Sequence, residues 1–364
     1  MIWTVLVLAV AFFAYSNGAN DNFKGFATIY GSGKLSYKKA ITWATITTFL
    51  GSLAAIILAV NLVKSFSGRG LVPDSIVADP IFAVSVAMGA AMTIILATKI
   101  GMPVSSTHAM VGALVGTGLA ISGGEVAFSK LATVFVLPLI LTPVCSAFLS
   151  YILLRFQLKS LRDERNCVCI PEEKVLVQTT ENRQVLELPS LIFEKSENCD
   201  QIPVKSVFSF DREKAEDYLH FFSAGLVSFA RGLNDTPKIV ALLILIPFLN
   251  VQAGMVLVAL VMAIGGLINS RKIAETMSHK MTSMTGRQGL SANLITSSLV
   301  MGASVFGLPA STTHVSVGAL AGMGWANGTA NFQVLRQILM AWMMTLPLGA
   351  VLGIGAYYLV QTIF

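Results

Sequence analysis

The stretch at residues 101–108 reads GMPVSSTH, and the stretch at residues 307–314 reads GLPASTTH. Both follow the pattern G-M/L-P-x-S-S/T-T-H, and both continue after a gap of two residues into V-G-A-L. A second motif, G-x-N-D-x-x-K, occurs at residues 18–24 and again at residues 232–238. The second copies follow the first by 206 and 214 residues, so two different motifs recur in one order at nearly one spacing. This pattern indicates two related halves, as in many secondary transporters.

The composition places the chain in a lipid bilayer. Of its 364 residues, 54% are hydrophobic and only 12% are charged, and the mean hydropathy is +0.73. Soluble domains carry about 25% charged residues, and a chain of this length cannot hide so much apolar surface from water. We therefore expect an all-α, multi-pass protein of the cell (inner or plasma) membrane. The net charge of +6 then reflects basic loops at the cytoplasmic leaflet, and no nucleic-acid partner is expected.

The apolar segments differ in length. A helix that crosses the bilayer core needs about 20 residues. Several predicted segments are shorter and lie beside Gly or Pro, which is typical of broken or re-entrant helices. The predicted segments cover residues 2–16, 40–63, 81–98, 104–121, 131–154, 219–230, 239–249, 253–268, 290–306, 315–326 and 338–360.

A polar stretch divides the chain into a first membrane repeat at 1–154, an insert at 155–217 and a second membrane repeat at 218–364. The insert is either a small folded lobe or a linker, and its runs at 175–177 and 207–210 have β-strand composition. Basic residues crowd its start, which places it in the cytoplasm by the positive-inside rule. They are Arg155, Lys159, Arg162 and Arg165.

The P-x-S-S/T-T-H motif predicts a helix start inside the membrane. Proline is tolerated in the first turn of a helix, and Ser and Thr are favoured N-cap residues. A helix start offers unpaired N–H groups and positive partial charge, so two starts that meet near the midplane would surround a tetrahedral oxyanion. The predicted anion-binding hydroxyls are those of Ser105, Ser106, Thr107, Ser311, Thr312 and Thr313. The alternative is that these side chains only cap helices or join them.

The G-x-N-D-x-x-K motif predicts buried charge. The residues concerned are Asn20, Asp21 and Lys24 in the first copy and Asn234, Asp235 and Lys238 in the second. An aspartate within an apolar segment is costly unless it is paired or binds an ion. The asparagine and aspartate oxygens suit Na⁺, or the aspartate carries H⁺; no other cofactor is predicted. The lysine lies three residues on, on the same helical face, so the alternative is a purely structural ion pair.

Four further residues lie near these motifs. His108 and His314 end the serine-rich motifs, where they either orient hydroxyls and carry protons or only pack. Arg231 precedes the second aspartate motif, and it either adds positive field there or extends to the membrane interface. Glu275 lies in a polar connection, as a loop anion or as the partner of a lysine near the site.

These motifs resemble those of the inorganic phosphate transporter (PiT-type) family of sodium- or proton-coupled permeases. The resemblance covers nearly the whole chain outside the insert and includes the element Ala274–Thr276. It implies inverted-topology halves, a transport domain that carries the motifs, a scaffold domain that forms a homodimer, and elevator-like alternating access. It also implies that Asn20, Asp21, Asn234 and Asp235 take part in anion and cation binding, together with the hydroxyls of both serine-rich motifs.

One position departs from the family pattern. Many members carry a second asparagine three residues after the first-half aspartate, where this chain has Lys24. A built-in ammonium there could occupy the space of one bound cation. The departure therefore leaves both sodium and proton coupling open.

Phosphate is the expected substrate, with sulfate as the alternative. Phosphate keeps a proton at neutral pH, so its site benefits from a carboxylate acceptor, whereas a sulfate site should exclude one. Asp21 or Asp235 in contact with the anion would therefore favour phosphate. An anion channel would need a continuous pore ring, and an intramembrane hydrolase built on Ser105, His108 and Asp21 would leave the second copy unexplained. We expect a transporter rather than an enzyme.

Overall fold

The computed structural model describes residues 1–160, 166–169, 176–178, 184–186, 192–195, 212–281 and 285–364. The chain forms two compact units. One comprises Met1–Leu154 together with His220–Phe364, and we call it the membrane unit. The other comprises Arg155–Leu219, which extends the predicted insert at 155–217 by two residues, and we keep the name insert for it.

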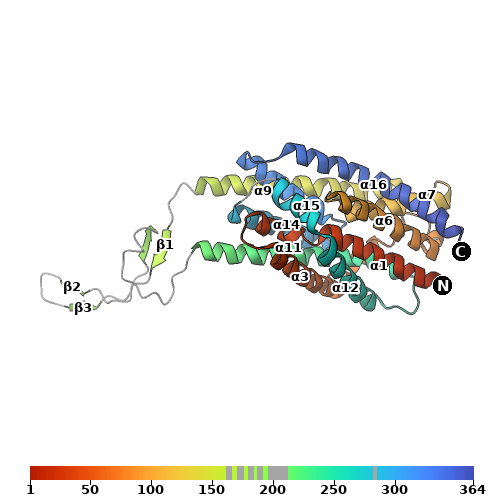
Figure 1. Ribbon diagram of the computed structural model, residues 1–364, viewed down its shortest axis with the longest axis horizontal. Coiled ribbons are helices and arrows are strands. Elements are labelled where there is room, and N and C mark those ends of the chain that lie inside the picture. Colours follow the sequence, from red (N-terminus) through yellow and green to blue (C-terminus); the bar gives the residue numbers. More distant parts are fainter. Residues whose placement is uncertain (161–165, 170–175, 179–183, 187–191, 196–211, 282–284) are drawn as a thin grey trace. The chain divides into compact units, whose positions relative to one another are not determined.

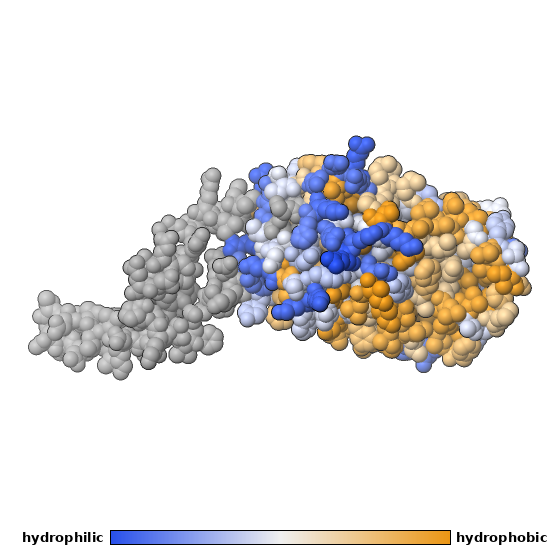
Figure 2. Space-filling view, in the orientation of Figure 1, coloured by the Kyte–Doolittle hydropathy of each residue, from blue (hydrophilic) through white to orange (hydrophobic). Residues whose placement is uncertain are grey.

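The membrane unit is built from long apolar helices. Among the described residues, six helical stretches are long and apolar enough to cross a membrane. They are Ile2–Gly31, Tyr37–Leu58, Pro80–Ile100, Phe128–Phe156, Val251–Asn269 and Phe332–Gln361. Large apolar side chains such as Ile57, Phe148 and Met343 are exposed on them, and Figure 2 shows hydrophobic residues over much of the unit's visible surface. Such a surface suits lipid rather than water.

The helices pack around α1 (Ile2–Asp21) and α16 (Phe332–Gln361). α1 packs against α6 (Pro80–Ile100) and α12 (Val251–Asn269), whereas α16 packs against α6 and α7 (Ser106–Ser122). The other long helices are α3 (Tyr37–Leu58), α9 (Leu137–Ser160), α11 (Arg212–Val240), α14 (Gly286–Val305) and α15 (Thr312–Asn327). Shorter helical elements are η1 (Lys24–Phe26), α2 (Ala27–Gly31), α4 (Val60–Ser65), α5 (Asp74–Val77), α8 (Phe128–Lys130), η2 (Leu131–Val136), η3 (Ala241–Leu243), α13 (Arg271–Glu275) and η4 (Thr276–Lys280).

Helix ends bring the motifs together in the membrane unit. The aspartate motifs lie at the C-terminal ends of α1 and α11, and these two helices run in opposite directions in Figure 1. Gly101 and Gly307, the first residues of the serine-rich motifs, adopt φ angles of 77° and 70°. This left-handed conformation favours glycine and lets the chain turn sharply after α6 and α14. The new helices α7 and α15 then begin inside the two motifs, which confirms the predicted helix starts.

α11 is longer than its apolar pattern predicts. The predicted segment ends at residue 230, yet the helix continues through Gly232 and Pro237 to Val240. The charged residues in this last part are buried and paired, so the chain can stay helical there. The predicted segment at 239–249 begins with the last two residues of α11 and otherwise holds only the short η3 and turns.

The insert contains two small antiparallel sheets. β1 (Asn166–Cys169) pairs with β4 (Ile192–Lys195), and β2 (Leu176–Gln178) pairs with β3 (Gln184–Leu186). The β-like run predicted at residues 175–177 overlaps β2. The run predicted at residues 207–210 lies outside the described residues.

Candidate functional site

The two serine-rich motifs form matched helix starts. Ser105 is the N-cap of α7, and its Oγ accepts the backbone N–H of His108 at 3.1 Å. Ser311 is the N-cap of α15, and its Oγ accepts the backbone N–H of His314 at 3.2 Å. Both serines are buried, so these helix starts lie inside the membrane unit. The first turn of each helix keeps N–H groups that have no acceptor within the helix, which an anion can use.

The two aspartate motifs form matched buried ion pairs. The Lys24 ammonium pairs with the Asp21 carboxylate, and the Lys238 ammonium lies 3.2 Å from Asp235 Oδ1. All four side chains are buried. Each lysine thus pairs with the aspartate three residues before it, Lys238 on the same helix α11 and Lys24 from η1, just beyond the end of α1. Burial of these charges is tolerable because each has an opposite charge and further hydrogen bonds.

Each lysine also reaches the serine-rich motif of the other half. Lys24 Nζ donates to Thr313 Oγ1 and, at 3.1 Å, to the carbonyl oxygen of Val104. Thr313 Oγ1 in turn donates to that same carbonyl at 2.8 Å. The aspartate motif and the serine-rich motif of the first half are thus both joined to the start of α15.

The same arrangement recurs with the roles of the two halves exchanged. Lys238 Nζ donates to Thr107 Oγ1 at 2.9 Å and to the carbonyl oxygen of Ala310 at 2.7 Å. Thr107 Oγ1 donates to the Ala310 carbonyl at 3.1 Å. The bonds between the halves are therefore reciprocal, and we call Thr107 and Thr313 the crossing threonines. Each of their hydroxyls has only one proton, which a carbonyl of the protein already accepts.

The asparagines join the two motifs within each half. Asn20 Nδ2 donates to Thr98 Oγ1 at 3.0 Å and to the Met102 carbonyl at 3.1 Å, while its Oδ1 accepts the Val104 N–H at 3.2 Å. Asn234 Nδ2 donates to the Ala310 carbonyl at 3.2 Å. Both asparagines therefore hold the segment that precedes a helix start.

The remaining predicted hydroxyls lie at the same place. Ser106 Oγ donates to Asp21 Oδ2 at 3.3 Å, which links the start of α7 to the end of α1. Thr312 is buried in the first turn of α15. All six predicted hydroxyl residues, both asparagines and both aspartate–lysine pairs thus gather in one buried region.

Arg231 belongs to this region, although the sequence left its place open. Its side chain is 1% exposed, so it does not extend to the membrane interface. Nη2 donates to Asn17 Oδ1 at 2.7 Å, Nη1 donates to Asn22 Oδ1 at 3.0 Å, and Nε lies 3.5 Å from Asp235 Oδ2. Asn17 directly precedes the first aspartate motif and Asn22 lies within it. These closely spaced amides in an apolar segment were the sequence signal that a buried polar partner such as Arg231 lies here.

We call Asp21, Lys24, Arg231, Asp235 and Lys238 the charged cluster. It contains three cationic and two anionic side chains, all buried. A buried surplus of positive charge is unfavourable unless an anion balances it. The charged cluster and the two helix starts therefore favour a bound anion at the same place.

The histidines lie beside the helix starts. The rings of His108 and His314 meet edge to face with centroids 4.4 Å apart, and His314 lies against Trp342 at 3.9 Å. His314 Nδ1 is 3.2 Å from the Leu139 carbonyl. Glu275 lies elsewhere, half exposed, and it pairs with Arg271 at 3.5 Å.

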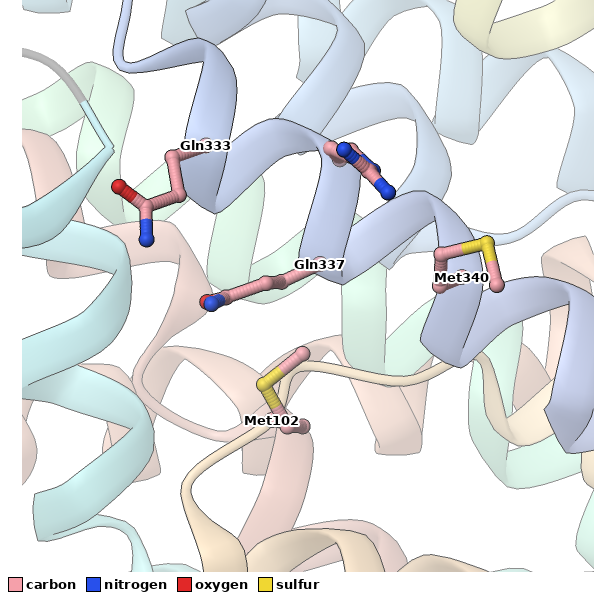
Figure 3. A pocket seen from close by; sticks show the side chains of 5 residues that line it. Met102, Gln333, Gln337 and Met340 are labelled. Carbon is pink, nitrogen blue, oxygen red and sulfur yellow. The ribbon is translucent and has the colours of Figure 1, made fainter.

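A pocket of about 530 Å³ opens beside the segment that precedes α7. Met102, Gln333, Arg336, Gln337 and Met340 line it, and Figure 3 shows Met102 facing the α16 side chains. The Met102 carbonyl accepts the Asn20 bond described above. Met102 thus belongs both to the wall of the pocket and to the segment that Asn20 holds.

Comparisons with known proteins relate the whole chain to one family. A profile of the family described as "Phosphate transporter family" matches residues 17–353. A protein of Haemophilus influenzae named "Putative phosphate permease" is 29% identical, over 100% of this chain and 98% of its own length. A protein of Thermococcus kodakarensis of the same description is 26% identical, over 96% of each chain.

A solved structure entitled "The sodium-dependent phosphate transporter" has the same fold. Its TM-score is 0.78 at 24% identity, and the match covers 100% of both chains. Together with the apolar helices, these likenesses describe a multi-pass membrane protein. Because the family profile matches most of its length, the chain belongs to the phosphate transporter family.

Proposed function

We propose that this protein is a symporter that moves inorganic phosphate across the membrane by elevator-like alternating access, coupled to Na⁺ or H⁺. The observation that carries the proposal is the reciprocal contact between Lys24 and Thr313 and between Lys238 and Thr107. It places two helix starts and a surplus of buried positive charge in one region that both halves build. Such a site can face either side of the membrane in turn when the domain that carries it moves.

The proposed phosphate site lies between the starts of α7 and α15. First-turn N–H groups and the hydroxyls of the serine-rich motifs donate to the phosphate oxygens, and the lysines balance its charge. In this structure the hydroxyls of the crossing threonines donate to carbonyl oxygens of the protein. We therefore propose that bound phosphate replaces these carbonyls as the acceptor. Asn20 and Asn234 complete the proposed substrate-binding set, and His108 and His314 orient it or carry protons.

The Asp21 carboxylate favours phosphate over the alternative, sulfate. Asp21 already accepts a hydroxyl bond from Ser106 at the start of α7. The same carboxylate is placed to accept a P–OH proton, which sulfate lacks.

The opposite directions of α1 and α11 in Figure 1 support inverted-topology halves. We propose that these two helices belong to a transport domain that moves against a scaffold domain, and that the scaffold forms a homodimer. In the proposed cycle, phosphate and the coupling ion bind together, so that their charges offset before the domain moves. Asp21 and Asp235 are the proposed carriers of the coupling ion.

Two other classes of function fit the geometry less well. An anion channel needs a continuous pore ring, whereas the site here is closed on itself by bonds between the halves. A hydrolase needs a nucleophile within reach of a base. Ser105 Oγ instead caps a helix by accepting the backbone N–H of His108, and the His108 ring faces His314.

Uptake by the reconstituted protein tests the proposal. Proteoliposomes are given labelled phosphate or labelled sulfate, with a sodium gradient and a proton gradient imposed in turn. We expect accumulation of phosphate above equilibrium with at least one gradient, and its loss in Ser311→Ala and Asp21→Asn variants. Sulfate accumulation without phosphate accumulation would identify a sulfate permease, and uptake that only follows the phosphate gradient would identify a channel.

A further inference from the structure

We infer that Lys24 and Lys238 are resident cations: their ammonium groups fill two oxygen sites that would otherwise suit Na⁺, so phosphate binds without free sodium there. This inference rests on the proposed function and narrows its coupling ion to H⁺. It concerns the same region as the phosphate site but a different ligand. It follows from the atoms around each ammonium.

The Lys24 ammonium lies among four oxygens of different kinds. They are a carboxylate oxygen of Asp21, the amide oxygen of Asn20 at 3.2 Å, the Val104 carbonyl at 3.1 Å and the Thr313 hydroxyl. Carboxylate, amide, carbonyl and hydroxyl oxygens are the ligands that hard cations take in proteins. The ammonium thus occupies the centre of a cation site built by both halves.

The Lys238 ammonium lies in a matching set. Asp235 Oδ1 is 3.2 Å away, the Ala310 carbonyl is 2.7 Å away and the Thr107 hydroxyl is 2.9 Å away. An ammonium has three donors, and these three acceptors use all of them. The match between the two sets shows that a lysine at this place is a repeated feature rather than one chance contact.

Binding of a free sodium ion to these oxygens would be costly in free energy. Both ammonium groups are buried, and the charged cluster already contains one more cation than anion. A sodium ion on the same oxygens would displace an ammonium and leave it buried without acceptors, which is strongly unfavourable. The predicted sodium ligands Asn20, Asp21 and Asp235 therefore do not fit Na⁺ in this chain. The proton is the coupling ion that remains of the two proposed.

A pair of variants separates the resident charge from the space that it fills. Lys24→Asn removes the ammonium and opens the oxygen set, whereas Lys24→Met removes the charge but keeps the bulk. Lys39→Asn is the matched control, because Lys39 is exposed at the start of α3. Phosphate uptake is measured in proteoliposomes with a proton gradient, in NaCl or in choline chloride at equal ionic strength.

We expect wild-type and Lys39→Asn uptake to be equal in sodium and in choline. Lys24→Asn uptake should fall about tenfold or more in choline, because a buried charge partner of Asp21 is lost, and recover most of that loss in sodium. Lys24→Met should stay low in both salts. Sodium should also raise the thermal unfolding midpoint of purified Lys24→Asn protein without changing that of the wild type.

Two results would overturn the inference: wild-type uptake that requires sodium, or Lys24→Asn behaviour that matches Lys24→Met in both salts. If Lys24→Asn does not fold, Lys238→Asn gives the same test at the second site, and the wild-type comparison decides by itself. Failure of the wild type to move phosphate under any gradient would instead contradict the proposed function, so the two failures are distinct.

Discussion

Arg231 shows what single residues contribute to the candidate site. Its guanidinium contacts Asn17 and Asn22 on one side and Asp235 on the other. A guanidinium holds five donors in a rigid planar fork, whereas the three donors of an ammonium rotate about its flexible stem. The arginine therefore ties α1 and the segment that follows it to α11, in addition to its charge.

Arg231→Leu should destabilise the protein by about 3 kcal/mol, the cost of breaking a buried ion pair and leaving its partners unsatisfied. Arg231→Lys should fall between this variant and the wild type. The matched control is Arg271→Leu, which breaks a pair of equal spacing and equal 3.5 Å distance whose side chains are 78% and 49% exposed. Exposed pairs contribute little, so its thermal unfolding midpoint should hardly change. Equal losses in the two variants would contradict the role given to Arg231.

At the residue scale, the sequence predicted the pairs that lie within one turn of helix. Asp21 with Lys24, and Asp235 with Lys238, follow from a spacing of three residues. It could not predict the crossing threonines, because those contacts join residues 131 and 289 positions apart. Their partners are set by how the halves pack, which no local pattern contains.

Helix starts are the elements to which we assign anion binding. Ser105→Ala and Ser311→Ala each remove an N-cap, so each should cost about 1 kcal/mol of stability. They should also lower phosphate affinity, because the first turns of α7 and α15 would lose their orientation. Asn250→Ala is the control: Asn250 Oδ1 accepts the Ala253 N–H at 2.7 Å at the start of α12, away from the candidate site. Isothermal titration with phosphate and thermal unfolding measure both effects, and affinity lost equally in the Asn250→Ala control would refute the assignment.

The aspartate motifs begin with glycines because neighbouring helices touch there. A Cβ added to Gly232 would lie 2.0 Å from the Thr48 carbonyl of α3, and one added to Gly18 would lie 2.0 Å from the Met262 carbonyl of α12. Because the backbones of two helices meet at each glycine, an added Cβ could not be accommodated by a side-chain rotation. These glycines therefore set how closely the helices approach.

Gly232→Ala should therefore cost about 1–3 kcal/mol, the usual effect of overpacking. Gly302→Ala in α14 is the control, because an added Cβ there meets nothing within 4 Å. Alanine in a helix is favoured over glycine by about 0.5–1 kcal/mol, so this variant should be slightly more stable than the wild type. Thermal unfolding in detergent gives the order of the three proteins, and a Gly232→Ala variant as stable as Gly302→Ala would show that α3 and α11 can separate.

At the element scale, local chemistry predicted where α7 and α15 begin, because N-caps and the preceding glycine act within a few residues. The apolar pattern, in contrast, placed the end of the segment at residue 230, whereas α11 extends to Val240. Its last turns are polar and stay helical through partners on α1 and α3. Hydropathy alone does not register such partners.

At the scale of the whole molecule, the position of the insert sets the orientation of the chain. The basic residues at its start predict that it lies in the cytoplasm. Protease added to inside-out vesicles should therefore cut the chain between residues 155 and 217, and protease added to right-side-out vesicles should not. Cleavage from the opposite side would reverse the predicted orientation of both halves.

The membrane class and the duplicated plan were predictable from composition and from two motifs repeated in one order. The fold of the insert was not, because its charges and short apolar runs carry no strong period. The convergence of motifs more than 200 residues apart became visible only in the structure, through contacts such as that of Thr107 with Ala310 and that of Lys24 with Thr313.

The contacts of the crossing threonines also have a consequence for how the protein assembles in the membrane during synthesis. Synthesis proceeds from the N-terminus, so Lys24 enters the bilayer before its partner Thr313, which follows 289 residues later, has been translated. Thr107 likewise enters the bilayer before its partner Lys238 has been translated. Until the C-terminal half inserts, the polar groups of the N-terminal half lack part of their coordination, which is costly in lipid. We therefore expect water to hydrate these polar groups until the C-terminal half has inserted.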